Sequence, residues 1–207
     1  YVAGGTVRNC TISGNTGWGS SWGGIYRTAG TVVNCIIAGN TAQMADNSGL
    51  EINGVSTAYT YCCCPVLTNG AGNTAADPVF ANAAAGDYTL RPTSPCLNAG
   101  TNYPGMAAAD LAGNARVANG QADIGAYERD LAAGALDCDF SAPVTAAFGS
   151  LQAALTAAVA GADTNIQWYW WDFGDSHGTN GASLAVVTNV YSAASNYTVS
   201  LTVSNLS

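Results

Sequence analysis

Apolar and polar residues alternate near the end of the chain with the two-residue period of a β-strand. Thr and Ser stand between four apolar residues, Tyr197, Val199, Leu201 and Val203. This alternation predicts a strand with one buried and one exposed face. An earlier aromatic run alternates in the same way. Its members of one parity, expected in the core, are Tyr169, Trp171 and Phe173. Those of the other parity, expected to point outward, are Trp168 and Trp170.

A second pattern repeats near the start of the chain. The segment Thr6–Thr16 recurs twenty-five residues later as Thr31–Thr41, and Gly24-Ile25 recurs as Gly49-Leu50. Short β-branched runs punctuated by Gly-Asn at this period predict the coils of a parallel β-helix, in which each coil needs a stacked neighbour to bury its inner face. A looser third coil follows at Ala58–Cys62.

Side chains at equivalent positions of successive coils should stack. Neighbouring parallel strands lie about 4.8 Å apart, so Asn9 over Asn34 predicts an amide ladder in a turn and Cys10 over Cys35 a column of small buried residues. The spacing also suits a Cys10–Cys35 disulfide. Both arrangements stay open. A catalytic role for either cysteine lacks a histidine to activate the thiol.

Composition narrows the class of protein. Charged residues make up 9% of the chain, and its 5 Lys+Arg, all of them arginine, face 13 Asp+Glu for a net charge of -8. This acidic balance cannot supply the cationic contacts that nucleic acid or an anionic membrane surface requires. We therefore expect no nucleic-acid partner. No apolar stretch is long enough to predict insertion into a membrane.

The cysteines favour an exported protein. There are 7 of them without metal-ligand spacing, and the single histidine, His177, is distant from all of them in sequence, so zinc is not expected. Scarce charge and abundant Thr, Ser, Asn and Gly fit a secreted or cell-surface protein. Tyr1 follows no apolar leader, and we expect a secretion signal to lie upstream.

A series of spaced motifs follows the coils. It consists of Asn73, Asp77–Phe80, Gly86–Leu90, Ser94–Gly100, Asp110–Arg116 and Asp123–Glu128. This order resembles the C-terminal part of bacterial surface proteins of the choice-of-anchor Q type, in the pectate-lyase-like superfamily. The resemblance implies that residues 1–130 form right-handed parallel β-helix coils with a C-terminal cap.

The resemblance also gives roles to particular residues. It implies a disulfide between Cys63 and Cys96 that ties the third coil to the cap, and it leaves Cys138 as the candidate for a free or intersubunit thiol. We expect a salt-bridged network to close the last coil, formed by Asp110, Arg116, Asp123 and Glu128.

A short linker, 131–136, precedes a second unit at 137–207. Its motifs are Trp170–Asp175, Val190-Tyr191 and Ser195–Asn205. They resemble the PKD domain, which implies an immunoglobulin-like β-sandwich. Ser176 replaces the glycine that usually follows the second Asp of the first motif. The fold class predicted for the whole chain is therefore all-β.

Tryptophans are the best candidates for a contact surface, because flat indole faces suit protein interfaces and sugar stacking. The four candidates are Trp18, Trp22, Trp168 and Trp170. The alternative is that these side chains only pack locally against a neighbouring loop or domain, and we rank this first. Contact with another protein ranks second, and contact with carbohydrate ranks last.

Two further kinds of site need weighing. Asp172 and Asp175 could bind calcium, although two carboxylates are few for that ion and a hydrogen-bonded turn is the alternative. Glycosylation is a hypothesis that would explain solubility with so little charge. The N-x-Ser/Thr sequons begin at Asn9, Asn196 and Asn205.

The function we predict is non-catalytic. The coils carry none of the charged pairs that polysaccharide cleavage requires, which favours a structural or adhesive protein of the bacterial surface. The coils begin without a cap, so we expect upstream coils or a neighbouring copy to cover them, and head-to-tail contact would give a fibre. The alternative is the non-catalytic tail of a secreted polysaccharide lyase or hydrolase.

Overall fold

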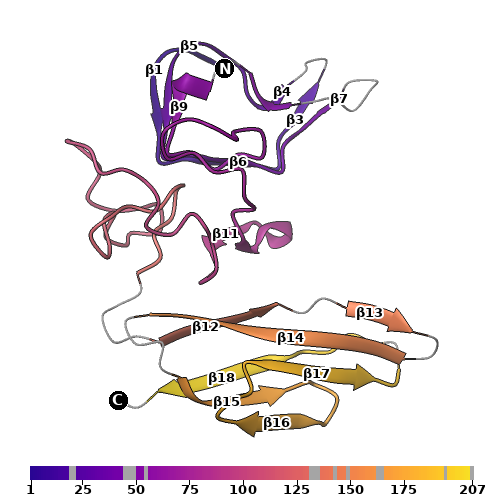
Figure 1. The fold of residues 1–207 in the computed structure, drawn as a ribbon. Helices are drawn as coiled ribbons and strands as arrows, with labels where there is room; N and C mark the ends of the chain where they lie inside the picture. Colours follow the sequence, from indigo (N-terminus) through magenta and orange to yellow (C-terminus); the bar gives the residue numbers. More distant parts are fainter. Residues whose placement is uncertain are drawn as a thin grey trace. The chain divides into compact units, whose positions relative to one another are not determined.

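The computed structural model describes residues 1–18, 22–43, 50–53, 56–130, 136–141, 144–147, 150–161, 166–193 and 195–205. The chain divides into two compact units, Tyr1–Asp130 (unit 1) and Leu131–Ser207 (unit 2). Within the described ranges the regular structure is strand except for two single-turn 3-10 helices, η1 (Ser56–Ala58) and η2 (Ala83–Ala85). The protein is all-β, as the sequence predicts (Figure 1).

Unit 1 begins with two successive turns of chain that stack on each other. The first turn contains β1 (Val2–Arg8), β2 (Thr11–Ser13), β3 (Thr16–Trp18) and β4 (Trp22–Ile25). The second contains β5 (Arg27–Val33), β6 (Ile36–Ala38), β7 (Thr41–Gln43) and β8 (Leu50–Ile52). Each strand pairs in parallel with its counterpart, and β9 (Tyr59–Thr60) adds to β5. The described pairings make small sheets of two or three strands.

The register of these pairings follows the sequence repeat on three of the four sides. Thr6 pairs with Thr31 and Thr11 with Ile36, as the repeat predicts. The fourth side departs from it, because Ile25 pairs with Ile52 and not with Leu50. The cause is chain length, since residues 44–49 separate β7 from β8 whereas only 19–21 separate β3 from β4.

Two apolar clusters hold unit 1 together. Inward-facing residues of the turns form the first, which includes the fully buried Val32, Ile37 and Tyr59. The second joins side chains of the opposite parity to the segment that follows, and includes Ile36, Cys63, Leu90, Cys96 and Ile124. Neighbouring residues of one strand therefore serve two cores, as strand alternation requires.

The segment 80–130 packs against the side of the stacked turns. It begins with an antiparallel pair, β10 (Phe80–Asn82) and β11 (Asp87–Leu90). The rest is held by backbone hydrogen bonds between distant residues, such as Ile124 N–H to the Cys96 carbonyl at 2.9 Å and Gly125 N–H to the Asn34 carbonyl at 2.9 Å. This segment positions the groove described below.

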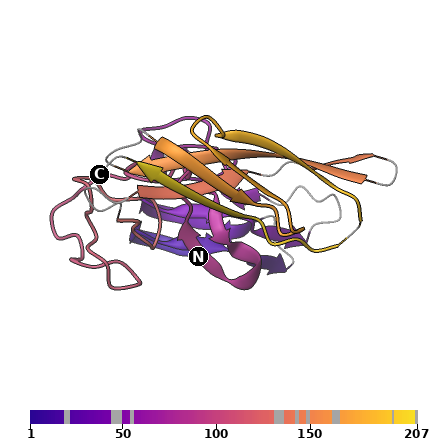
Figure 2. The same ribbon diagram turned by 90° about the horizontal axis from the view of Figure 1, so that it is seen from below.

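Unit 2 is a two-layer antiparallel structure (Figures 1 and 2). One sheet contains β12 (Leu136–Ser141), β13 (Val144–Ala147), β14 (Ser150–Gly161) and β17 (Val186–Tyr191). The other contains β15 (Ile166–Asp172), β16 (Gly178–Gly181) and β18 (Ser200–Asn205). The apolar cluster of the unit includes Leu155, Trp171, Phe173 and Tyr191.

The inward-facing and outward-facing residues predicted for the aromatic strand of unit 2 are confirmed. Trp171 and Phe173 are buried, Tyr169 packs against them, and Trp168 and Trp170 are exposed. The final strand is shorter than its alternation suggests and begins at Ser200. Before it, Tyr197 stacks on Tyr191 with ring centroids 4.2 Å apart. At the start of the alternating segment, the stacking of Tyr197 on Tyr191 therefore takes the place of strand pairing.

Candidate functional site

The site is built at one corner of unit 1, where β1 turns into β2 and β5 into β6. Asn9 and Asn34 occupy this turn with φ of 50° and 53°, and Tyr61 holds the same place in the third turn of chain with φ of 51°. Asparagine tolerates this left-handed conformation better than most residues. Each of the three is followed by a cysteine, so the backbone turn fixes where three thiols lie.

The predicted amide ladder is present. The Asn34 amide donates to Asn9 Oδ1 at 3.1 Å and to the Thr101 carbonyl at 2.8 Å, and its own oxygen accepts from Thr101 N–H at 2.8 Å. Asn34 is fully buried. Its amide therefore joins the stacked turns to the segment 80–130, and the sequence did not indicate this contact.

Cys10, Cys35 and Cys62 form a column of thiols behind these turns. Cys35 lies between the other two and hydrogen-bonds to both side chains. The bond to Cys35 lowers the pKa of the Cys10 thiol to about 6 and also lowers the pKa of Cys62, while that of Cys35 is raised well above its ordinary value by the same two bonds. Cys10 is half-buried, whereas Cys35 and Cys62 are fully buried.

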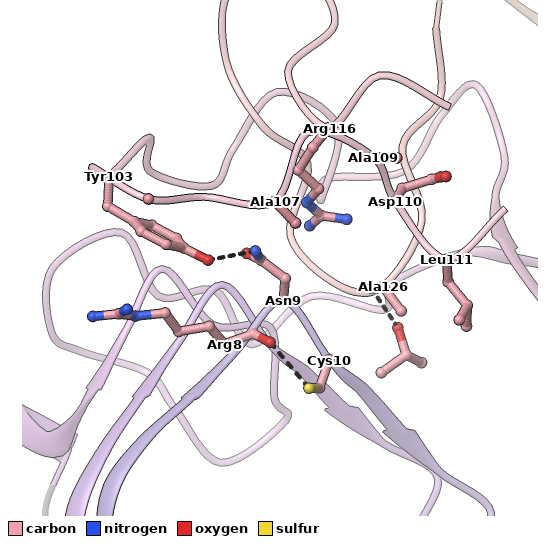
Figure 3. Close-up of a pocket in the computed structure, with 12 residues that line it drawn as sticks. Arg8, Asn9, Cys10, Tyr103, Ala107, Ala109, Asp110, Leu111, Arg116 and Ala126 are labelled. Atoms are coloured by element: carbon pink, nitrogen blue, oxygen red, sulfur yellow. Dashed lines mark hydrogen bonds between the residues drawn. The ribbon is translucent and has the colours of Figure 1, made fainter. Parts of the chain in front are cut away.

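A groove of about 640 Å³ opens beside Cys10 (Figure 3). The Arg8 guanidinium lies 4.5 Å from the centre of the Tyr103 ring, and the Tyr103 hydroxyl accepts from the Asn9 amide at 2.6 Å. Residues of the first turn of chain and of the segment 80–130 line it, among them Arg8, Asn9, Cys10, Tyr103, Asp110 and Arg116. Cys10 thus lines the same groove as Arg8 and Arg116, and its thiol donates to the Arg8 carbonyl at 3.0 Å.

The expected charged network adjoins this groove, and most of its hydrogen bonds join a side chain to the backbone. Buried Arg116 donates to the Gly125 carbonyl at 2.5 Å, and its Nε lies 3.4 Å from Glu128 Oε1. Glu128 accepts from Asp123 N–H at 2.8 Å. Asp110 accepts from Glu128 N–H at 2.7 Å. Burial, reinforced by the charge of Asp123, raises the pKa of Glu128 to about 7.

The cysteines of the two predicted disulfides lie together in pairs, and the structure holds them as thiols. Cys63 and Cys96 share the second apolar cluster, and the hydrogen bond between them raises the pKa of Cys63. Cys10 and Cys35 interact in the column described above. Both disulfides stay predictions. Cys138 lies in unit 2, where its thiol donates to the Leu201 carbonyl at 3.7 Å.

The candidate tryptophans are divided between the two units. Trp168 and Trp170 lie on β15 with exposed fractions of 38% and 43% and ring centroids 6.2 Å apart. Trp22 is half-buried in unit 1, where its ring lies 4.8 Å from that of Tyr26. The side chain of Trp18 lies outside the described part of the structure.

The two calcium candidates act in a turn. Asp172 Oδ1 accepts from Gly174 N–H at 2.9 Å, and Asp175 accepts from His177 N–H at 3.0 Å and from the Asn189 amide at 2.8 Å. Within the described ranges, no three His, Cys, Asp or Glu residues are grouped so as to hold a metal ion. These bonds favour the turn interpretation over the calcium one.

A second polar ladder was missed by sequence reasoning. Asn40 Oδ1 accepts from Asn15 N–H at 3.0 Å, and the Asn40 amide donates to Glu51 at 2.6 Å. Glu51 is buried and also accepts from Asn40 N–H at 3.0 Å. The signal was available, because Gly-Asn-Thr occurs in both repeats and Glu51 is a rare charge among the coils.

Unit 2 has the two-sheet architecture and the turn motif at Trp170–Asp175 that the sequence resemblance implied. Residues 141–207 match the PKD domain. The PKD prediction is therefore confirmed for this part, which is less than half of the chain. PKD domains are typical of extracellular proteins. Ser176, which replaces the usual glycine, has a φ of 71°.

No curated protein and no solved structure matches the chain. The resemblance of the first 130 residues to choice-of-anchor Q proteins stays a prediction. In the ranges that the structure describes, no helix has both the length and the apolar character needed to cross a membrane.

Proposed function

We propose that this chain is a non-catalytic structural or adhesive part of an extracellular bacterial surface protein. In this proposal unit 1 is a short piece of right-handed parallel β-helix with its cap, and the PKD domain follows it. The parallel pairing of β1–β4 with β5–β8 supports the β-helix. Right-handedness follows from the general rule for parallel crossovers.

The observation that carries the non-catalytic assignment is the use of the acidic side chains. Each carboxylate between residues 50 and 129 accepts a hydrogen bond from a backbone N–H of the chain: Glu51, Asp77, Asp87, Asp110, Asp123 and Glu128. Glycoside hydrolysis instead requires two carboxylates that face each other across the substrate. Here the carboxylates hold turns and close the cap.

Self-association is the second part of the proposal. On the outer side of the first turn, Val7, Cys10 and Ile12 are only partly buried against the apolar cluster. Its strands are sheet edges in the described pairings. Exposed edges with an apolar interior are templates for another strand. A further coil or a second copy would cover them, and contact with a second copy in head-to-tail fashion propagates into a fibre.

Light scattering and electron microscopy of the purified chain test the assembly. We expect concentration-dependent oligomers for the wild type and their loss in Ile12→Arg, which places a charge at the partly buried end of the stack. Val186→Arg is the matched control, because Val186 is 61% exposed in unit 2 and is expected not to affect assembly. A wild-type chain that stays monomeric at high concentration would overturn the fibre.

A panel of acidic and neutral polysaccharides tests the absence of catalysis. We expect the purified chain to release no reducing ends and no unsaturated ends from any of them. Release of either kind of end by the wild type would refute the proposal. Release that persists in Glu128→Gln and in Asp110→Asn would refute it too and would show that the catalytic group lies elsewhere in the chain. The alternative function, a tail attached to a lyase or hydrolase, also predicts no release by this chain.

A further inference from the structure

Three thiols in a row are more than packing requires. Cys10, Cys35 and Cys62 occupy equivalent positions of three successive turns, and Ile36 N–H, directly after Cys35, bonds to the Cys10 carbonyl at 2.9 Å. Parallel neighbours in this register have Cα atoms about 5 Å apart, inside the range that a disulfide accepts. Cys35 can therefore pair with either neighbour, but with only one at a time.

Access distinguishes the members of the column. Cys10 is half-buried and lines the groove, whereas Cys35 and Cys62 have no exposed surface. Cys10 is thus the member of the column that a reagent in the groove meets first, and Cys35 lies behind it. This order of access resembles that of an attacking thiol with a resolving thiol behind it.

The surroundings of Cys10 favour the reactive form of its sulfur. The hydrogen bond from Cys35 and, to a smaller extent, the bond to the Arg8 backbone and the charge of Arg116 lower the pKa of Cys10, which increases the share of its thiolate form. The thiolate is the nucleophile in disulfide exchange. The exposed Arg8 lines the same groove and would attract a reagent that carries carboxylates.

We propose that Cys10 and Cys35 form a redox-active thiol pair that reacts with low-molecular-weight disulfides entering the groove. The Cys10 thiolate attacks one sulfur of the small disulfide, forming a mixed disulfide and releasing the first small thiolate. Cys35, on losing its proton, then attacks the Cys10 sulfur, forms the Cys10–Cys35 disulfide and releases the second. The two protein protons end on the released thiols, and the pair loses two electrons to the small disulfide.

The test uses the full chain, reduced and freed of reductant, in its monomeric fraction from size-exclusion chromatography. Oxidised glutathione is the probe, and intact mass followed by trypsin and chymotrypsin mapping is the measurement. Cleavage after Arg8, Arg27 and Tyr61 separates Cys10 from Cys35 and Cys35 from Cys62. We expect the wild type to end as Cys10–Cys35 disulfide with little retained glutathione.

The variants separate the two steps. Cys35→Ser should retain about one equivalent of glutathione on Cys10, because the resolving thiol is absent. Cys10→Ser should form neither the adduct nor the disulfide in the column. Cys138→Ser, in unit 2, is the control and should behave as the wild type. If Cys35→Ser does not fold, rapid acid quenching of the wild type should still capture the transient Cys10 adduct.

Two results would overturn the proposal. One is adduct formation in Cys35→Ser that does not map to Cys10, and the other is a wild type whose column remains reduced under excess probe. The proposal is independent of the fibre, because it is measured on monomer. Assembly through the coil end would cover Cys10, and oligomers should then react more slowly than monomer.

Discussion

Asn34 makes the clearest test of how the polar ladder stabilises unit 1. The Asn34→Ala variant removes three hydrogen bonds of a fully buried amide, two of them to Thr101. At about 1 kcal/mol each, this loss amounts to about 3 kcal/mol. Alanine must also adopt the φ of 53° that Asn34 holds, which adds about 1 kcal/mol. We expect unit 1 to lose about 4 kcal/mol in total.

Two comparisons separate these contributions. Asn34→Gly loses the same bonds without the backbone strain and should cost about 1 kcal/mol less than Asn34→Ala. Asn9 has nearly the same φ, but its side chain is half-buried and bonds to the Tyr103 hydroxyl and the Asn34 amide. Water can replace part of these contacts, so Asn9→Ala should cost about 2 kcal/mol.

Native-state hydrogen exchange measures unit 1 without interference from unit 2. The reporters are the amides of Ile36, Ile37 and Cys63, which bond between turns at 2.8 to 2.9 Å. A loss of about 4 kcal/mol should speed their exchange about a thousandfold. Equal effects for Asn34→Ala and Asn9→Ala, or an Asn34→Gly variant as unstable as Asn34→Ala, would refute the reasoning.

Two further predictions concern a titrating group and a strained turn. Folding raises the pKa of Glu128 from 4.5 to about 7, because burial disfavours the carboxylate. Its protonated form therefore favours the folded state, and the contribution of Glu128 to the stability of unit 1 is fully present below about pH 4.5 and falls as the pH rises through 7, by up to about 3 kcal/mol. Glu128→Gln should remove this decline in urea unfolding and be the more stable chain at pH 8; a steeper decline would contradict the assignment. Ser176 holds a φ of 71°, so Ser176→Gly should stabilise unit 2 by about 1 kcal/mol in thermal unfolding, whereas an unchanged melting temperature would show that the turn is not strained.

Local patterns predicted the parts of this protein that depend on neighbouring residues or on a strict repeat. The parity rule placed Trp171 in the core and Trp170 outside because a strand alternates whatever it packs against. The ladder from Asn9 to Asn34 was predictable because an equal offset puts equivalent residues in adjacent turns. These inferences needed no knowledge of the rest of the fold.

Other parts depend on contacts between distant residues. Thr11 accepts from Ala126 N–H across a separation of 115 residues, and Tyr103 reaches Asn9 across 94. No pattern in either segment specifies the other, so the groove beside Cys10 was not predictable. Glu51 differs from these cases, since its carboxylate bonds to Asn40 of the same turn, 11 residues away, and only the closing of that turn brings the two together.

The shifted register between β4 and β8 has a consequence for how such a chain can change over time. Ile25 pairs with Ile52 although the segment between β7 and β8 is longer than the one between β3 and β4, and from Thr6 onward the pairings on the other three sides keep the offset of the repeat. Insertions and deletions can therefore accumulate on that side while the Asn-Cys corner is conserved in spacing. Variation in length among related sequences should then be greatest between β7 and β8, where the register between turns does not depend on the length of the repeat.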